Sequence, residues 1–235
     1  MSARFDGILF DAGGVLMVPD PYQTSIVLSP FGATGEAAAH VRAHYAAITA
    51  LEGPALAAEE PSLEHVDWSP YRTAFAASVG VREAAMADAV AALDELWSPY
   101  LWRHVLGTAV AALASLHRRS VPIGVVSNAS GQVEHALRYL GICQVGEGAG
   151  VPVSCVVDSH VVGVAKPDPA IFTHGLAALG LSPERVAYVG DSVINDVGGA
   201  RAAGLVPLLV DPYDDRAHLP GIERIRSLHE LLAWV

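Results

Sequence analysis

Lysine is nearly absent from this chain. Lys166 is the only lysine among its 14 lysine and arginine residues. Acidic residues outnumber basic ones by 25 to 14, which gives a formal net charge of −11. Proteins that bind nucleic acid present a basic stripe to the phosphate backbone, and this sequence contains none. We therefore expect no nucleic-acid partner. A small anionic substrate remains compatible with the sequence, since a pocket can be locally positive.

Cysteine and long apolar runs are scarce as well. The two cysteines, Cys143 and Cys155, form no CxxC pair and indicate no disulfide framework. No apolar run reaches the ~18 residues that a membrane helix requires. Asp6 and Asp11 interrupt the apolar stretch near the N-terminus, which argues against a signal peptide. These absences predict a globular, cytoplasmic protein without a membrane partner.

What the sequence does contain is an alternation of short apolar segments and amphipathic helical segments. Buried strands are predicted at residues 5–10, 121–128, 153–159, 185–192 and 206–211. Helices are predicted at residues 108–119, 131–141, 168–180, 195–204 and 225–235. Strands that alternate with helices of this length predict an α/β fold with a Rossmann-like, doubly wound parallel sheet.

The segment from about Pro19 to Tyr100 differs in character. It consists of alanine-rich helical stretches such as GEAAAHVRAHYAAITAL, broken by prolines, and it shows no convincing strand. We interpret residues 19–101 as an inserted all-helical domain. Residues 1–18 and 102–235 would then form the α/β core domain.

Polar residues lie at the carboxyl ends of three of the predicted strands, namely Asp11, Ser127 and Asp191. Each is unremarkable alone, because an Asp after a strand is usually a turn former and Ser127-Asn128 is an ordinary helix cap. Ligands of parallel sheets bind at the carboxyl ends of the strands. The three positions are therefore expected to share one edge of the sheet.

Four local motifs stand in order along the chain: Asp11 in GILFDAGGVLM, Ser127 in VPIGVVSN, Lys166 in AKPDPAIF, and Asp191 with Asp196 in GDSVINDVGGA. The order and the residues of these motifs resemble those of the haloacid dehalogenase-like hydrolase superfamily. The resemblance is closer to the branch that has a helical cap between the first two motifs. The resemblance extends from residue 5 to about residue 204, and the fourth motif is its most specific part. It implies that residues 19–101 are the cap.

The resemblance implies a nucleophile and a metal site. Asp11 would attack phosphorus in line and form an aspartyl-phosphate, which divides one difficult step into two. Mg²⁺ prefers oxygen ligands, typically one or two carboxylates with waters. Asp11 and Asp191 would supply the carboxylates, Asp196 would bind directly or through water, and Gly13 would offer its backbone carbonyl.

The resemblance also implies how phosphate would be bound. A phosphoryl group in transfer carries charge on its oxygens and needs cations and hydrogen-bond donors around it. Hydrogen bonds would come from the hydroxyl of Ser127 and from the backbone amides of Gly13, Gly14 and Asn128. Lys166 would neutralise charge on both the nucleophile and the phosphate of a small phosphorylated substrate.

Gly13 departs from the pattern of the resembled phosphatases. Their residue at this position is an Asp that serves as general acid and base, and glycine cannot exchange a proton. General acid–base catalysis typically contributes ~10²–10⁴ in rate. Glycine retains the carbonyl that holds the metal, so the departure is expected to spare Mg²⁺ binding and to weaken activity on alkyl phosphates.

Two functions therefore stay open at this stage. The first is a Mg²⁺-dependent phosphohydrolase that is weakened, restricted to good leaving groups, or supplied with a proton donor from the cap. The second is a catalytically impaired protein that binds a phosphorylated metabolite or a protein partner without turnover. Two further branches fit badly, because phosphonate hydrolases need a cap lysine and 2-haloacid dehalogenases lack the carboxylate-rich fourth motif.

The remaining features are interpreted as structural. His40 and His44 lie four residues apart on a predicted helix, but no third zinc ligand has matching spacing, so a solvated helix face is expected. The glycine-rich CQVGEGAGVPVS is expected to be a flexible connection, since no GK[ST] follows it. The acidic DPYDDRAH is expected to be an exposed loop. Most cap aromatics should form the core of the cap, and the sequence predicts no particular oligomeric state.

Overall fold

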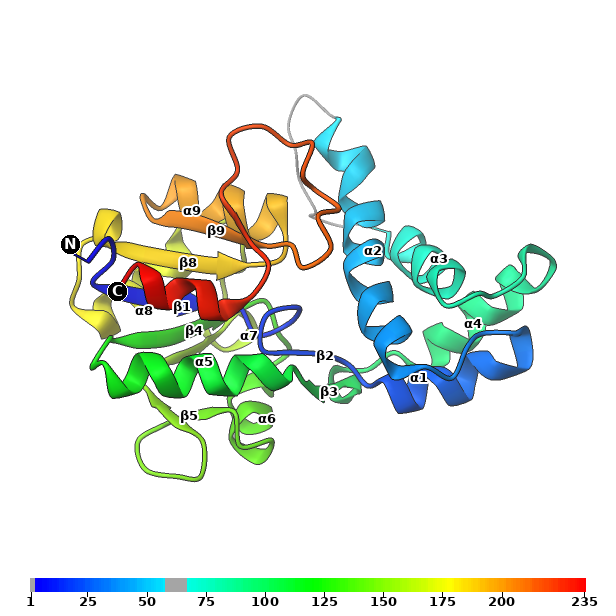
Figure 1. Ribbon diagram of the computed structural model, residues 1–235, viewed down its shortest axis with the longest axis horizontal. Coiled ribbons are helices and arrows are strands. Elements are labelled where there is room, and N and C mark those ends of the chain that lie inside the picture. Colours follow the sequence, from blue (N-terminus) through cyan, green and yellow to red (C-terminus); the bar gives the residue numbers. More distant parts are fainter. Residues whose placement is uncertain (1–2, 58–66) are drawn as a thin grey trace. The chain divides into compact units, whose positions relative to one another are not determined.

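The computed structural model describes residues 3–57 and 67–235 (Figure 1). The chain divides into two units, each with its own dense set of internal contacts. The core unit comprises Met1–Met17 and Val105–Val235, and the helical unit comprises Val18–His104. The chain passes between them at β2 (Met17–Pro19) and β3 (Trp102–Val105), which pair as a two-stranded sheet.

A six-stranded sheet forms the centre of the core unit, in the order β10-β9-β8-β1-β4-β7. Its strands are β1 (Gly7–Phe10), β4 (Ile123–Ser127), β7 (Val156–Asp158), β8 (Val186–Gly190), β9 (Val206–Val210) and β10 (Arg224–Ile225). Every adjacent pair is parallel. The order extends outward from β1 in both directions, so the predicted doubly wound parallel sheet is confirmed.

The central strands are buried along their whole length. All residues of β1, β4 and β8 are buried, which explains why they form short continuous apolar runs rather than alternating patterns. Figure 1 shows β8, β1 and β4 side by side. Leu9 of β1 lies opposite Gly124 of β4 and Tyr188 of β8. This register aligns the carboxyl ends of three strands at one edge of the sheet.

Helices flank the sheet, with bounds α5 (Gly107–Arg118), α6 (Val133–Tyr139), α7 (Ser159–Val162), α8 (Ala170–Leu179) and α9 (Gly199–Ala202). Residues from α8 and α9 share a buried cluster with Leu9, Val126 and Tyr188. α8 is capped at its C-terminus by Gly180, whose φ of 66° is the left-handed conformation that glycine adopts readily. The predicted helix 195–204 begins instead as a π-helix, Val193–Gly198.

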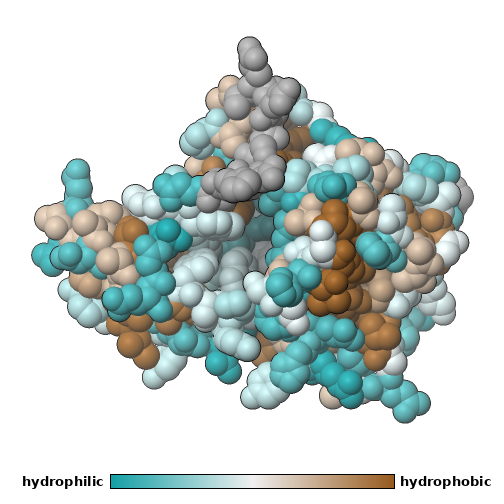
Figure 2. Space-filling model, turned by 180° about the vertical axis from the view of Figure 1, so that it is seen from behind, coloured by the Kyte–Doolittle hydropathy of each residue, from teal (hydrophilic) through white to brown (hydrophobic). Residues whose placement is uncertain are grey.

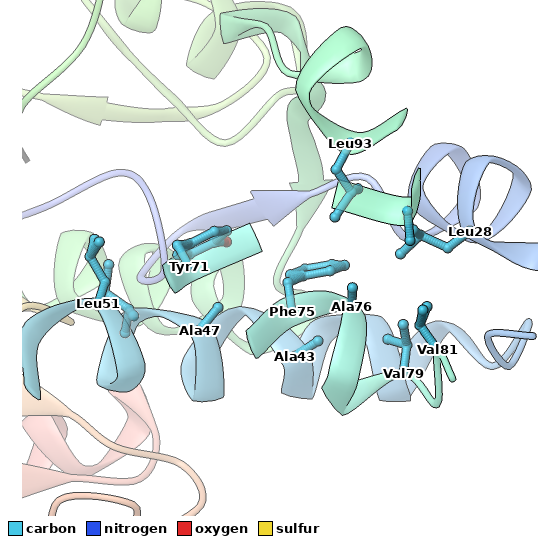
Figure 3. Close-up of a cluster of buried hydrophobic side chains, with 12 residues drawn as sticks. Leu28, Ala43, Ala47, Leu51, Tyr71, Phe75, Ala76, Val79, Val81 and Leu93 are labelled. Atoms are coloured by element: carbon cyan, nitrogen blue, oxygen red, sulfur yellow. The ribbon is translucent and has the colours of Figure 1, made fainter. Parts of the chain in front are cut away.

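The helical unit contains α1 (Pro21–Leu28), α2 (Ala37–Leu56), α3 (Ser69–Ser78) and α4 (Met86–Leu96). Its core is a cluster of buried side chains, shown in Figure 3, in which Tyr71 and Phe75 of α3 face Ala43 and Ala47 of α2. Tyr71 and Phe75 are completely buried. For these two aromatic residues, the expectation that they form the core of the inserted unit is confirmed.

The two histidines of α2 contradict the predicted solvated face, because His40 and His44 are both buried. The ring nitrogens of His40 bond to Thr24 Oγ1 at 2.9 Å and to the Thr34 carbonyl at 2.8 Å. Nδ1 of His44 bonds to the Tyr71 hydroxyl at 2.8 Å. Both nitrogens of His40 are therefore engaged within the unit, which leaves none for a metal.

Two other segments are more ordered than the sequence predicts. CQVGEGAGVPVS contains β5 (Cys143–Val145) and β6 (Val151–Val153), which form a parallel pair. The side chain of Gln144 bonds to both the amide and the carbonyl of Gly150, at 2.8 and 3.0 Å. These bonds close the intervening loop, so the expected flexible connection is wrong.

The predicted C-terminal helix 225–235 is also wrong in type. The structure forms β10 and then a 3₁₀ helix, Leu228–Ala233, with a capping box between Ser227 and Glu230. Shorter 3₁₀ helices occur at Ser29–Phe31, Glu83–Ala85, Pro99–Leu101 and Pro183–Arg185.

The acidic loop DPYDDRAH is not simply exposed. Asp211 is buried, accepts hydrogen bonds from the amides of Asp215 and Arg216, and pairs with Arg224 at 3.0 Å. The exposed-loop prediction therefore fails at Asp211, whose carboxylate organises the turn.

Within residues 3–57 and 67–235, no helix is both long and apolar enough to cross a membrane. Figure 2 shows hydrophilic and hydrophobic residues interspersed on one face.

Candidate active site

Three adjacent strands deliver polar residues to one edge of the sheet. Asp11 follows β1, Ser127 is the last residue of β4, and Asp191 follows β8. All three are buried, and the amide of Asp11 donates to the carbonyl of Val189 at 2.8 Å. The polar residues at the ends of the predicted strands are thus neighbours in space, and the sheet holds their backbones.

A third carboxylate joins this edge from the π-helix. One carboxylate oxygen from each of Asp11, Asp191 and Asp196 lies within 4.8 Å of the others. Asp196 Oδ2 accepts a hydrogen bond of 2.8 Å from the amide of Ser192, whose own hydroxyl caps the helix. Turns of π-helix occur often at functional sites, and here one turn returns the Asp196 carboxylate to the end of β8.

Lys166 lies among these carboxylates. Its Nζ is 2.9 Å from Asp11 Oδ1 and 2.6 Å from Asp196 Oδ1. Burial by itself would lower the pKa of Lys166, but the charges of Asp11 and Asp196 raise that pKa above its ordinary value. The amine is therefore held as an ammonium ion.

Asn128 fixes the loop that carries this lysine. Its Nδ2 donates to the Lys166 carbonyl at 2.9 Å, and its Oδ1 accepts from the Lys166 amide at 2.8 Å. The side chain of Asn128 is thus engaged with the loop. The prediction that Asn128 donates to phosphate concerns its backbone amide, which these two bonds do not involve.

The charges in the site do not balance. Burial raises the pKa of Asp11 to about 7, with Asp196 and Asp191 adding to the rise and Lys166 and the Ser127 hydrogen bond opposing it. With all three carboxylates ionised, the one ammonium offsets one of the three charges, and two negative charges are left in a buried place. A divalent cation that prefers oxygen ligands, as Mg²⁺ does, fits this donor set.

The Gly13-Gly14 turn follows the first carboxylate. Gly14 has a φ of 68° and its amide donates to the Met17 carbonyl at 2.8 Å, so that amide is engaged within the turn. Gly13 forms a bridge with Met17 and has no positive φ. The two glycines therefore differ: the positive φ favours glycine at position 14, whereas φ imposes no such demand at position 13.

Sequence reasoning missed Tyr188, which is completely buried in the middle of β8. Its hydroxyl lies 2.8 Å from Lys166 Nζ, 2.8 Å from the Val126 carbonyl and 3.3 Å from Asp196 Oδ1. In the sequence it is one more large residue of an apolar strand. The one sign in the sequence is the tyrosine hydroxyl itself. It lies two residues before the end of the strand, and a buried hydroxyl needs a hydrogen-bond partner.

A comparison with protein families agrees with this arrangement. Residues 5–204 match the family model of haloacid dehalogenase-like hydrolases. The chain belongs to the haloacid dehalogenase-like hydrolase family. The match extends from the residues just before β1, through the helical unit, to the end of α9, so it contains all four motifs.

Relatives of the same family include phosphatases. The chain is 33% identical to the mouse haloacid dehalogenase-like hydrolase domain-containing protein 3 over 162 residues, which are 65% of this chain and 61% of the mouse protein. It is 37% identical to a phosphoserine phosphatase of Thermus thermophilus over 103 residues, 44% of this chain and 39% of that enzyme. The matches thus cover less than two thirds of the length of either relative.

Solved structures of the haloacid dehalogenase (HAD) superfamily share the fold. A HAD phosphatase from Thermococcus onnurineus has a TM-score of 0.58 and 19% identity, covering 97% of this chain and 96% of its own. A 2-haloacid dehalogenase from Pseudomonas syringae has a TM-score of 0.53 and 20% identity, and the match covers 96% of this chain and 97% of that chain. Because both reactions occur on this fold, the fold does not select between them, and the site residues must.

Proposed function

We propose that this chain is a Mg²⁺-dependent phosphohydrolase that acts on a small phosphorylated substrate through an aspartyl-phosphate on Asp11. The observation that carries the proposal is the buried group of three carboxylates around the ammonium of Lys166. A metal-independent dehalogenase has no use for so many acids. Relatives named as phosphatases support the choice of phosphate, among them a ribulose-1,5-bisphosphate 5-phosphatase of Halopiger xanaduensis.

Asp11 and Asp191 would hold the metal, together with the backbone carbonyl of Gly13. Both oxygens of Asp196 already accept hydrogen bonds, from Lys166 Nζ and from the Ser192 amide, which favours a contact of Asp196 through water. When bound, Mg²⁺ would offset the charge on the oxygens of the transferring phosphoryl group.

The chain's own residues would perform the two steps. An Asp11 oxygen forms a bond to phosphorus while the bond from phosphorus to the leaving oxygen breaks. Lys166 and the Ser127 hydroxyl would stabilise charge on the phosphoryl oxygens. Water then attacks the phosphorus and the bond from phosphorus to the Asp11 oxygen breaks. The Asp11 carboxylate is restored, and the protons of the water leave with inorganic phosphate.

Gly13 restricts this chemistry. It provides no acid to protonate the leaving oxygen and no base to activate the water. We therefore assign the chain to substrates whose leaving group departs without a proton, such as acyl or aryl phosphates. In the same proposal, the helical unit Val18–His104 serves as the cap that selects the substrate.

A second function, binding of a phosphorylated metabolite or of a protein partner without turnover, is favoured by Gly13 alone. The retained nucleophile favours the enzyme, because a site that only binds phosphate gains nothing from a carboxylate facing it.

Phosphate release from acetyl phosphate and p-nitrophenyl phosphate, measured with Mg²⁺ and with EDTA, tests the proposal. We expect turnover that requires Mg²⁺ and is lost in Asp11→Asn, which keeps the size of the side chain. If no phosphate is released from a broad panel while vanadate still stabilises the protein against heat, the binding function replaces the enzyme.

A further inference from the structure

Tyr188 connects three strands whose ends carry the proposed site. It belongs to β8, its ring packs edge-on against Phe172 at 4.8 Å, and its hydroxyl reaches the Val126 carbonyl on β4. Since β1 lies between β8 and β4 in the sheet, the side chain crosses over β1. The polar end of a core residue is thus brought to the carboxyl edge of the sheet.

The hydroxyl has three neighbours but only one proton to donate. The Val126 carbonyl can only accept, and at 2.8 Å it is closer than Asp196 Oδ1 at 3.3 Å. The Lys166 ammonium can only donate. The hydroxyl therefore gives its proton to Val126 and accepts one from Lys166 at 2.8 Å. Burial and the nearby acids raise the pKa of Tyr188, which keeps this proton in place.

The Lys166 ammonium has three protons to donate. One goes to the Tyr188 oxygen and one to Asp196 Oδ1 at 2.6 Å. The remaining proton is available to Asp11, whose Oδ1 lies 2.9 Å away. Without the hydroxyl, Asp196 would be the strongest partner left, and one N–H of a buried ammonium would lose its acceptor.

We propose that Tyr188 is a positioning residue, whose hydroxyl anchors the Lys166 ammonium to β4 and holds it between Asp11 and Asp196. It does not touch the substrate. Its effect on turnover rests on the proposed phosphohydrolase function, whereas its effect on the lysine does not.

The single lysine makes the test specific, because a protein labelled with ¹⁵N-lysine has one Nζ signal. Tyr188→Phe removes only the hydroxyl. We expect the Nζ resonance to shift and its protons to exchange with water at least about tenfold faster, the effect of one hydrogen bond to a charged group. With acetyl phosphate, kcat should fall about tenfold, whereas KM should change little.

Phe172→Leu is the matched control, because it disturbs packing on the same ring and leaves the hydroxyl in place. If Tyr188 had a purely structural role, two variants that lose the same melting temperature would change the Nζ signal and kcat equally. The proposal predicts that Phe172→Leu keeps the wild-type Nζ signal and kcat.

An unchanged Nζ signal in Tyr188→Phe overturns the proposal, even if no substrate is ever turned over. Absence of turnover in every variant, with the Nζ signal shifted as expected, would instead remove the proposed function and keep the positioning role. If Tyr188→Phe does not fold, the wild-type protein decides: an ammonium that exchanges as fast as that of free lysine refutes the anchoring.

Discussion

Gly190 lies directly against the carboxyl group of Asp196. A Cβ atom built on Gly190 would overlap the Cγ, Cβ and Oδ2 atoms of Asp196. The Asp196 carboxylate is itself held by Lys166 and by the Ser192 amide. The side chain that the fourth motif brings back to the sheet therefore has its place only because β8 ends in glycine.

We predict that Gly190→Ala displaces Asp196 and lowers the free energy of unfolding by about 1–3 kcal/mol, as overpacking does elsewhere. The stabilisation of the protein by Mg²⁺ against heat should shrink as well. Gly198→Ala is the control, because its Cβ would lie at an ordinary 3.6 Å from the Val193 carbonyl. We expect Gly198→Ala to leave stability unchanged or to raise it. Equal effects of the two variants in urea denaturation would contradict the role given to Gly190.

Gly13→Asp should restore the missing acid. Because Gly13 has no positive φ, an Asp fits the backbone there, and phosphate release from an alkyl phosphate should rise by about 10²-fold, the lower end of what general acid–base catalysis contributes. Gly14→Asp places the same carboxyl group one residue further on, where φ is 68°. It should bring no gain and should lower the melting temperature. No gain from Gly13→Asp would mean that something other than this acid limits the reaction.

Asn128→Ala should loosen the loop of Lys166. The change removes both hydrogen bonds to the Lys166 backbone and should lower the free energy of unfolding by about 1 kcal/mol, with a fall in kcat on acetyl phosphate. Ser130→Ala is the control on the loop that carries Asn128, because Ser130 bonds to Gln132 through its amide, which the change retains. A kcat for Asn128→Ala that matches the control would show that the loop holds Lys166 without Asn128.

His40 should make stability depend on pH. Burial lowers the pKa of His40, although its bond to the Thr34 carbonyl acts in the opposite direction. In the unfolded chain a histidine takes up a proton near pH 6.5, where the folded chain still resists it, so the unfolded state binds more protons. The free energy of unfolding should therefore fall as the pH drops below about 6.5, and level off below the folded pKa.

His40→Gln should flatten this dependence in urea denaturation at several pH values. His117→Gln, which changes an exposed histidine, should keep the wild-type slope. If both variants retain the slope, another group governs acid stability.

The sequence predicted those parts of the fold that follow from periodicity. All five predicted strand segments contain an observed strand, because buried parallel strands form short apolar runs that turns interrupt. The final segment, IRSLHELLAWV, misled because its apolar spacing suits both a long α-helix and the short 3₁₀ helix that follows β10. Tertiary packing decides between those two, and spacing cannot.

For the site, strand ends and motif order predicted which residues would meet. They could not predict the polar roles of residues that look apolar or neutral in one dimension. Tyr188 resembles any large strand residue until its hydroxyl is seen beside Lys166. His40 and Asp211 were expected at the surface because they are polar, yet specific partners, Thr24 and Arg224 among them, satisfy them in buried places.

Confinement of the only lysine to the site has a consequence for the chemistry of the whole surface. The side chain of Lys166 is 2% exposed, so these 235 residues present no accessible lysine amine when folded. Acylating reagents, and enzymes that attach ubiquitin or acetyl groups to lysine, would reach it only when its loop opens. The rate at which Lys166 becomes acylated would therefore measure how often that loop opens.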